Sequence, residues 1–320
     1  MANEVWYNYF LKALLVRYPK RGQLVEELMN LLCIERESVY RRLRKEVIFP
    51  ASEIVKIAAA WNISLDGLIG IDSGKISFQM QLMDYLDPDD QEARLLQAVV
   101  DGLLRTKNFP DSEYMEVCNR LPRLLLAGYS NLNQFYLFKW IYQYSNRETV
   151  VPFSQVIISE EKRRITSAYY KAVKQIPNTS FIFSHKLFNN ILIDIQYFHS
   201  IQLVTDEEKE SIRNELYDLL DYLLKVANKG CYPETNNKVN LYISQLIVDT
   251  NYSYIQTDEV NICFVHAFDK YEIYTLDPKM FKNFKEWMKL KLRTSIQISK
   301  VDEKSRIDFF AKARQVVESI

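Results

Sequence analysis

The residues of this 320-residue chain that are best suited to chemistry are a group of cations near its N-terminus. Between positions 36 and 45 a single acid, Glu37, stands among five basic side chains: Arg36, Arg41, Arg42, Arg44 and Lys45. Arginine can form paired hydrogen bonds with the edge of guanine in the major groove, and basic side chains can neutralise phosphates. The cluster therefore indicates a nucleic-acid contact made by one short segment.

This basic cluster is a local feature, because the chain as a whole carries no net charge. Lysine plus arginine and aspartate plus glutamate each number 41. Residues 1–70 hold ten basic and eight acidic side chains, so even there the excess is small. The composition excludes a general attraction to nucleic acid and leaves a contact confined to one element.

Apolar spacing predicts five short helices in residues 1–70, and these must position the cluster. The second helix begins near Gln23 and carries leucines at intervals of three and four residues, and a break at 33–34 separates it from a third helix over 35–46. A fourth helix is predicted over 51–61 and a last short turn over 65–69. Two helices joined by a tight break can present one of them to a DNA groove.

The third predicted helix separates a core side from an outer side. Val39 and Leu43 fall on the side that faces the other helices, and four polar or charged side chains project together on the opposite side: Arg36, Tyr40, Arg41 and Arg44. On this outer side, arginine can contact guanine and the other side chains can reach phosphates or base edges.

The segment from Gln23 to Gly70 resembles the lambda-repressor-like helix-turn-helix family, also called the Cro or xenobiotic-response-element type. The resemblance covers about a fifth of the chain. It lies in a helix ending Leu28-x-x-x-Leu32, in Ile34-x-x-x-x-Val39 at the start of the recognition helix, and in the closing pattern WNISLDGLI over 61–69. A weaker similarity of the whole chain is to bacterial regulators that join this module to a large uncharacterised C-terminal domain.

The resemblance implies which residues contact DNA. Base readout falls to the start and middle of the third helix: Arg36, Glu37, Tyr40 and Arg41. Gln23 is a candidate phosphate contact through its side chain or the helix N-terminus, and Arg44 and Lys45 complete the expected site.

Three positions depart from the family pattern. Met29 stands where the family usually has alanine, Cys33 replaces the common turn glycine, and Lys45 stands where a glycine often ends the recognition helix.

The remainder of the chain predicts a linker over 71–88 and a second domain over 89–320. Its helices are expected at 89–107, 131–144, 205–229, 278–292 and 303–320. Beyond Pro233 the period changes to two, where Val239, Leu241 and Ile243 alternate with polar neighbours, and later strands are expected over 252–256, 261–268 and 271–275 because these runs are rich in β-branched and aromatic residues. The expected fold class is therefore α+β: an all-α helix-turn-helix domain followed by a mainly helical C-terminal domain with a small antiparallel sheet.

Catalytic and cofactor chemistry lack their usual patterns. The seven glycines fit none of G-x-G-x-x-G, G-x-x-x-x-G-K-[ST] and G-x-S-x-G. Cys263 and His266 have a spacing seen in zinc sites, but at three residues apart on a strand they would point to opposite faces. We expect no metal, no cofactor and no catalytic residue. An enzyme in the second domain would require a deep cleft with converging ionisable side chains.

These patterns together predict a sequence-specific transcriptional regulator that binds double-stranded DNA as a homodimer, with the helix over 205–229 as one possible dimer surface. The four dispersed cysteines, and the absence of a signal peptide or long apolar run, favour a cytoplasmic protein without a membrane segment. Aromatic residues near 135–144 and 242–264 could line a pocket for a small-molecule or protein effector. The alternative is a protein-interaction adaptor whose helix-turn-helix module no longer reads DNA.

Overall fold

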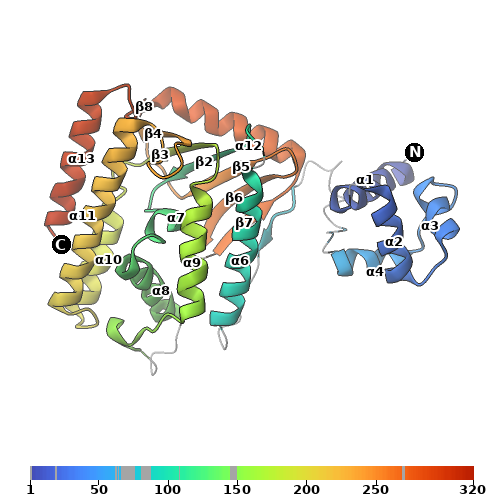
Figure 1. Cartoon of the computed structure of the whole chain (residues 1–320), viewed down its shortest axis with the longest axis horizontal. Helices are drawn as coiled ribbons and strands as arrows, with labels where there is room; N and C mark the ends of the chain where they lie inside the picture. Colours follow the sequence, from blue (N-terminus) through green and yellow to red (C-terminus); the bar gives the residue numbers. More distant parts are fainter. Residues whose placement is uncertain are drawn as a thin grey trace. The chain divides into compact units, whose positions relative to one another are not determined.

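The computed structural model describes residues 2–18, 20–61, 63, 65, 76–80, 88–107, 109–144, 150–268 and 271–320. Its contacts divide the chain into two compact units, Met1–Ser77 and Phe78–Ile320 (Figure 1). Of the segment expected to be a linker, residues 71–75 and 81–87 lie outside the described residues. Gln79 and Met80, between them, form strand β1 of the second unit.

The first unit is helical and packs around one apolar core. Its described helices are α1 (Ala2–Arg17), α2 (Arg21–Leu32), α3 (Arg36–Leu43) and α4 (Ala51–Trp61). The core is drawn from all four helices and from the segment before α4, with Phe10, Leu24, Leu28, Val39, Phe49 and Ile57 almost fully buried. Of the last predicted turn, over 65–69, only Leu65 is described.

Helix α3 ends at Leu43, three residues earlier than the expected 46, because a tight turn closes it. The Lys45 N–H donates to Arg42 O at 3.1 Å and the Glu46 N–H donates to Arg41 O at 2.9 Å, which is the hydrogen-bond pattern of a Schellman cap. Lys45 has φ +66°, in the left-handed region that this cap requires. Arg44 and Lys45 therefore lie in the turn and not on the helix.

The turn between α2 and α3 uses the same backbone conformation. Cys33 ends α2 with φ +56°, and its N–H donates to Met29 O at 2.9 Å. Glycine adopts this conformation without a steric penalty, whereas other residues incur one. Cys33 and Lys45, two of the positions that depart from the family pattern, are thus positions where the chain uses left-handed backbone without glycine.

The described residues of the second unit form an eight-stranded mixed sheet in the order β1-β7-β6-β5-β2-β3-β4-β8. β2, β3 and β4 run parallel, and the remaining pairs are antiparallel. The strands are β1 (Gln79–Met80), β2 (Glu113–Cys118), β3 (Asn178–Phe183), β4 (Lys238–Ser244), β5 (Tyr252–Gln256), β6 (Asn261–Phe268), β7 (Tyr271–Thr275) and β8 (Ser295–Gln297).

Helices cover both faces of this sheet. One face packs on α6 (Pro88–Thr106), α7 (Arg123–Leu126), α8 (Ser130–Tyr144), α9 (Glu160–Val173), α10 (Asn189–Ser200), α11 (Asp206–Lys229) and α13 (Glu303–Glu318). The opposite face packs on α12 (Pro278–Lys291) through Phe281, Phe284 and Met288. Short 3-10 turns at Phe153–Gln155 and Leu292–Thr294 complete the described elements. Helices α11 and α13 lie side by side (Figure 1).

The expectation of a mainly helical C-terminal domain with a small antiparallel sheet is wrong, because the sheet has eight strands and three of them, β2, β3 and β4, run parallel. The reason lies in β2 and β3, which are buried on both faces. A strand covered on both sides has no alternation of polar and apolar residues, so a period of two does not reveal it. The antiparallel strands β5, β6 and β7 have the bounds that their β-branched and aromatic content predicted. Within the described residues, no helix is both long and apolar enough to span a membrane.

Candidate functional site

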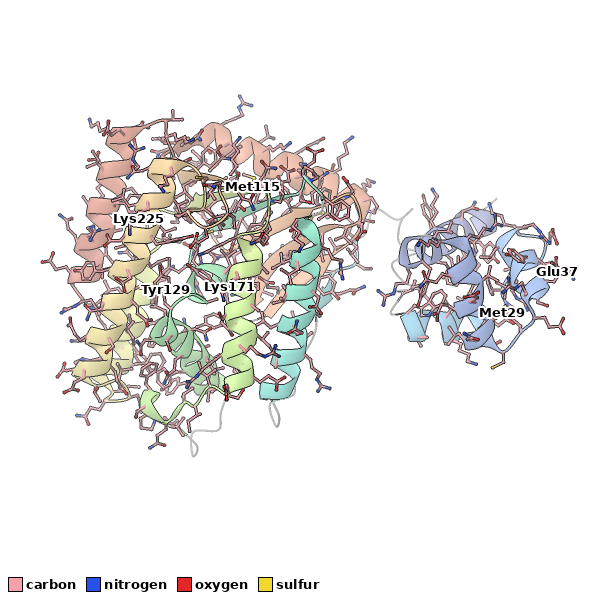
Figure 2. All side chains as sticks on the ribbon, viewed as in Figure 1. Met29, Glu37, Met115, Tyr129, Lys171 and Lys225 are labelled. Atoms are coloured by element: carbon pink, nitrogen blue, oxygen red, sulfur yellow. The ribbon has the colours of Figure 1, made fainter. Side chains whose placement is uncertain are left out.

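The outer side of α3 carries most of the residues expected to contact DNA. The side chains of Arg36 and Arg41 are 59% and 55% exposed, and Glu37, at 68%, lies on the outer side of the unit (Figure 2). Tyr40 is half-buried between this side and the core. On the opposite side of the helix Val39 is completely buried. The fold therefore groups these four outer residues on one short helix.

Acidic neighbours contact the exposed arginines. Arg44 lies 2.7 Å from carboxylate oxygens of both Glu37 and Glu46, Arg41 lies 3.6 Å from Glu46, and Arg36 lies 3.8 Å from Glu26. The hydrogen bond to Glu46, followed by that to Glu37, raises the pKa of Arg44, and Arg44 in turn lowers the pKa of Glu46.

Exposed ion pairs of this kind contribute little to stability because water and salt screen them, so a phosphate or a base edge can displace them at small cost. They also reduce the net positive charge of the surface, because each acid partly neutralises the arginine it contacts.

Arg42 belongs to the same basic run in the sequence but has a different environment. Its guanidinium donates to both carboxylate oxygens of Glu53, at 2.7 and 2.8 Å, and to Ser38 O at 3.0 Å. The Tyr7 hydroxyl donates to Arg42 O and accepts from the Phe49 N–H, both at 3.2 Å. Arg42 thus links α3 to α4 and α1 within the fold.

The N-terminus of α2 adds further polar groups. Gln23 is exposed in the first turn of this 12-residue helix, and Lys20 at its N-cap makes no side-chain capping bond. The first amides of a helix attract anions when no side chain caps them. The Arg21 guanidinium lies 6.0 Å from the centre of the Tyr40 ring, which connects the start of α2 to α3. Lys20 and Arg21 were not predicted, although Lys20 is the N-cap of α2 and Arg21 is its first residue.

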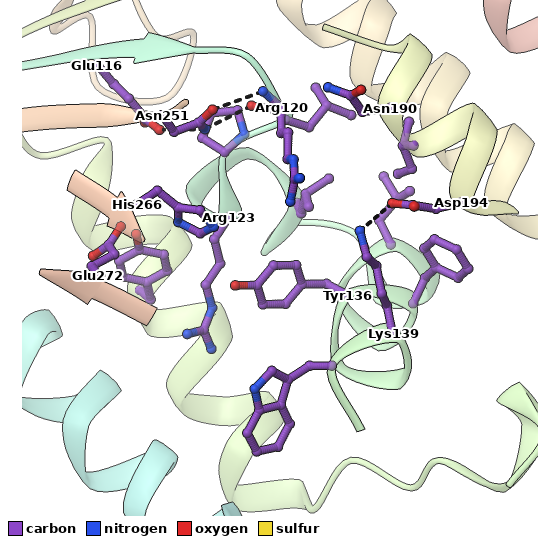
Figure 3. A pocket seen from close by; sticks show the side chains of 18 of the residues that line it. Glu116, Arg120, Arg123, Tyr136, Lys139, Asn190, Asp194, Asn251, His266 and Glu272 are labelled. Atoms are coloured by element: carbon purple, nitrogen blue, oxygen red, sulfur yellow. Dashed lines mark hydrogen bonds and ion pairs between the residues drawn. The ribbon is translucent and has the colours of Figure 1, made fainter. Parts of the chain in front are cut away.

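A second candidate site is a cavity of about 210 Å³ inside the C-terminal unit (Figure 3). It lies where the carboxyl end of β2 meets the start of β5, the end of β6 and the start of β7. Its walls come from α6, α7, α8, α9 and α10. Ligand sites in open α/β sheets form at the carboxyl ends of strands, because the loops and helices diverge there.

Asn251 holds the loop after β2 at the edge of this cavity. Its side-chain oxygen accepts from the Asn119 and Arg120 N–H groups at 2.8 and 2.9 Å, and its amide donates to Arg120 O at 3.0 Å. The Asn190 amide of α10 donates to Asn119 O at 3.0 Å. These bonds fix the backbone of Arg120 independently of its side chain.

Glu116 is the most deeply buried acid of the cavity wall, with 6% of its surface exposed. Burial, with a smaller contribution from the nearby Glu272, raises the pKa of its carboxyl to about 8, although hydrogen bonds from Tyr114 and Asn251 oppose the shift. The Tyr114 hydroxyl lies 2.8 Å and the Asn251 amide 3.2 Å from the two carboxyl oxygens. Glu116 is therefore largely protonated, and neutral, at pH 7.

Other charged side chains around the cavity come from separate elements. The Lys139 ammonium of α8 lies 2.6 Å from Asp194 of α10, and the Arg123 guanidinium of α7 lies 5.7 Å from the centre of the Tyr136 ring. Glu272 of β7 lines the cavity and is exposed, although desolvation by the surrounding protein raises its pKa while Arg123 opposes the rise. Figure 3 shows these side chains arranged around Tyr136.

The predicted candidates in this unit fall on both sides of the sheet. His266 lines the cavity, whereas Cys263 is buried on the α12 face, so the two residues point to opposite faces as the alternation predicted. Phe135 lines the cavity, but Tyr252 and Tyr254 pack on the α12 face. Among the residues that the structure describes, no group of three histidines, cysteines or acids could hold a metal ion.

No protein family, no curated protein and no solved structure matches this chain. The fold itself joins a compact helical unit, which has an exposed basic helix, to a mixed α/β unit with an internal cavity. The geometry of these two features is therefore the basis for assigning a function.

Proposed function

We propose that this protein is a cytoplasmic, sequence-specific DNA-binding transcriptional regulator, in which α3 reads the major groove. The observation that supports the proposal is that α3 has two different sides. Arg36, Tyr40 and Arg41 share its outer side, while Val39 on the opposite side is buried in the core. A major groove about 12 Å wide accepts a helix presented in this way. The C-terminal unit would provide dimerisation or signal input.

The proposed contacts follow from the chemistry of each side chain. Arg36 and Arg41 can donate paired hydrogen bonds to guanine, and Glu37 can accept from the amino group of cytosine. Gln23 and the open amides at the start of α2 would hold a phosphate and set the register of the helix. Lys45, in the turn after α3, would contact the backbone of the same duplex.

A dimer would place two α3 helices in successive major grooves, about 34 Å apart. Helix α11, the suggested dimer surface, buries its apolar side within its own unit, with Ile212, Leu216 and Leu223 almost fully covered. Any dimer contact through α11 would therefore use its charged side.

The test is a selection of bound duplexes from a randomised pool at two salt concentrations, using the full chain. We expect enrichment of an inverted repeat. The double variant Arg41→Ala/Arg44→Ala should lose the preference for the selected site. The control, Lys171→Ala/Lys225→Ala, removes the same charge from exposed positions of the second unit (Figure 2). It should keep the preference for the selected site. Binding to selected and random duplex with equal affinity at about 150 mM salt would refute the proposal, since specific sites commonly bind at least about 10³-fold more tightly.

The alternative is an adaptor whose helical unit binds a protein and not DNA. The observation that favours it is the pairing of Glu26, Glu37 and Glu46 with the outward arginines, which makes this surface nearly charge-balanced. An adaptor would bind duplex weakly, with an affinity that hardly changes with salt. A DNA reader loses affinity steeply as salt rises, because its phosphate contacts release counterions.

Catalysis is not part of the proposal, although ionisable side chains do converge on the cavity of the second unit. The proposal assigns these side chains a binding role, because charged and apolar groups share the same cavity wall.

A further inference from the structure

We propose that the cavity around Tyr136 binds a small organic monocarboxylate with an apolar, ring-containing body. Such binding involves the C-terminal unit alone and does not require that the protein bind DNA. Only a regulatory consequence of the ligand would rest on the proposed function. Three observations support it: the size of the cavity, the balance of charge around it, and the apolar nature of its remaining walls.

The size of the cavity suits a ring with a short side chain. Its volume is about 210 Å³, and an apolar cavity of about 150 Å³ is already sufficient to hold benzene. A second cavity, of about 260 Å³, shares Val99, Tyr169 and Glu272 with the first. The second cavity is walled mainly by apolar residues of α6, α9, β5 and β6.

The charge around the first cavity favours an anion. Its described walls carry three basic side chains, Arg120, Arg123 and Lys139, and three acids, Glu116, Asp194 and Glu272. Because Glu116 is largely protonated at neutral pH, the bases outnumber the ionised acids. A single carboxylate would neutralise the excess, and charge-assisted hydrogen bonds from arginine to a carboxylate are among the strong ones in proteins.

The positions of these groups leave a place for the carboxylate. Arg120 and Arg123 both come from the segment that follows β2, and with Lys139 of α8 they approach the space beside Tyr136 (Figure 3). Asn190 and Asn251 stand on the same side of the cavity and hold the β2 loop in place.

The rest of the wall is apolar and aromatic. Leu96, Leu126, Leu132, Phe135 and Ile191 line it, together with the rings of Tyr136 and Trp140. A ligand that is charged at one end and apolar at the other would therefore satisfy both parts of the cavity.

The test uses the full chain labelled with 5-fluorotryptophan and read by fluorine NMR. The chain has four tryptophans: Trp140 lines the cavity, Trp287 lies on α12 at the opposite face of the sheet, and Trp6 and Trp61 belong to the first unit. The Trp140→Phe variant assigns the cavity resonance. Titration with 3-phenylpropionate should shift the Trp140 resonance in a saturable way and leave the other three unchanged.

The neutral analogue 3-phenylpropionamide has the same body without the charge, and we expect it to bind about tenfold more weakly or worse, because it loses a charge-assisted hydrogen bond. Arg120→Gln should weaken binding of the carboxylate by a similar factor and leave that of the amide unchanged. The Arg120 backbone is held by Asn251, so this substitution keeps the loop anchored. Lys171→Gln, at an exposed position outside the cavity, is the control and should bind like the unmodified chain.

Three results would overturn the proposal. One is a Trp140 resonance that does not respond to 3-phenylpropionate. Another is an equal response of all four tryptophans, which would indicate non-specific association. The third is equal affinity for acid and amide in the unmodified chain, which needs no variant and would show that the cavity does not select an anion.

Discussion

Replacing Glu116 by glutamine should stabilise the C-terminal unit, and by an amount that grows with pH. The Glu116 carboxyl has a pKa of about 8 in the folded chain, against an ordinary value of 4.5. At a pH between these two pKa values, the unfolded chain carries an ionised Glu116 carboxylate while the folded chain keeps the proton. Stability is therefore full below about pH 4.5, and it falls by about 1.4 kcal/mol per pH unit until about pH 8. At pH 7 the accumulated loss is about 3 kcal/mol.

Glutamine removes this loss and retains both hydrogen bonds. Its carbonyl oxygen can accept from the Asn251 amide, and its NH₂ group can donate to the Tyr114 hydroxyl oxygen, at the positions of the two carboxyl oxygens. We expect Glu116→Gln to match the unmodified chain near pH 4.5 and to exceed its stability by about 3 kcal/mol at pH 7.

The assay is hydrogen exchange followed by mass spectrometry, corrected for intrinsic exchange rates at each pH. Peptides that cover β2 and β3 report the opening of the C-terminal unit alone, which matters because the chain has two units. Glu234→Gln is a control of opposite sign. Desolvation raises the pKa of Glu234, but the bond and charge of Lys174, at 2.6 Å, together with hydrogen bonds from the backbone and Tyr222, lower it below its ordinary value. This control should lose stability at neutral pH and match the unmodified chain in acid. A stability difference between Glu116→Gln and the unmodified chain that stays constant from pH 5 to pH 8 would show that Glu116 is ionised in the fold, and the reasoning would be wrong.

Three further predictions concern the first unit. Cys33→Gly should raise thermal stability by about 0.5 to 1 kcal/mol, because it relieves a left-handed backbone, while Cys33→Val should lower it; the same melting temperature for both variants would contradict this. Arg42→Ala should cost about 2 kcal/mol of stability in urea unfolding, because it leaves the largely buried Glu53 without its partner. Arg41→Ala should unfold like the unmodified chain, and equal losses would show that Arg42 has no special structural role. Glu46→Gln should increase affinity for duplex DNA and steepen its logarithmic salt dependence by roughly 0.9 for each additional phosphate that the freed arginines neutralise, whereas an unchanged slope would place Arg41 and Arg44 away from the backbone.

Local sequence patterns were sufficient to predict the bounds of a helix or strand where the residues that begin and end it have a distinctive type. The capping box at Thr205 and the left-handed Gly230 delimit α11 as expected, since each acts within a single turn of helix. The bounds of the antiparallel strands β5 to β7 follow from their runs of β-branched and aromatic residues. The two turns around α3 show the opposite case, because Cys33 and Lys45 occupy glycine-like backbone that their residue types do not indicate.

The sequence by itself determined the helical first unit, the basic cluster on its third helix, and the strands that alternate. Only the tertiary structure decided the size and direction of the sheet, because β2 and β3 are buried on both faces and hide their period. It also separated Arg42, which binds Glu53 within the fold, from its exposed neighbours. The cavity could not be predicted from the sequence, because Glu116, Lys139 and Glu272 come from elements that are far apart in the sequence. Long-range contacts, and not spacing along the chain, bring such groups together.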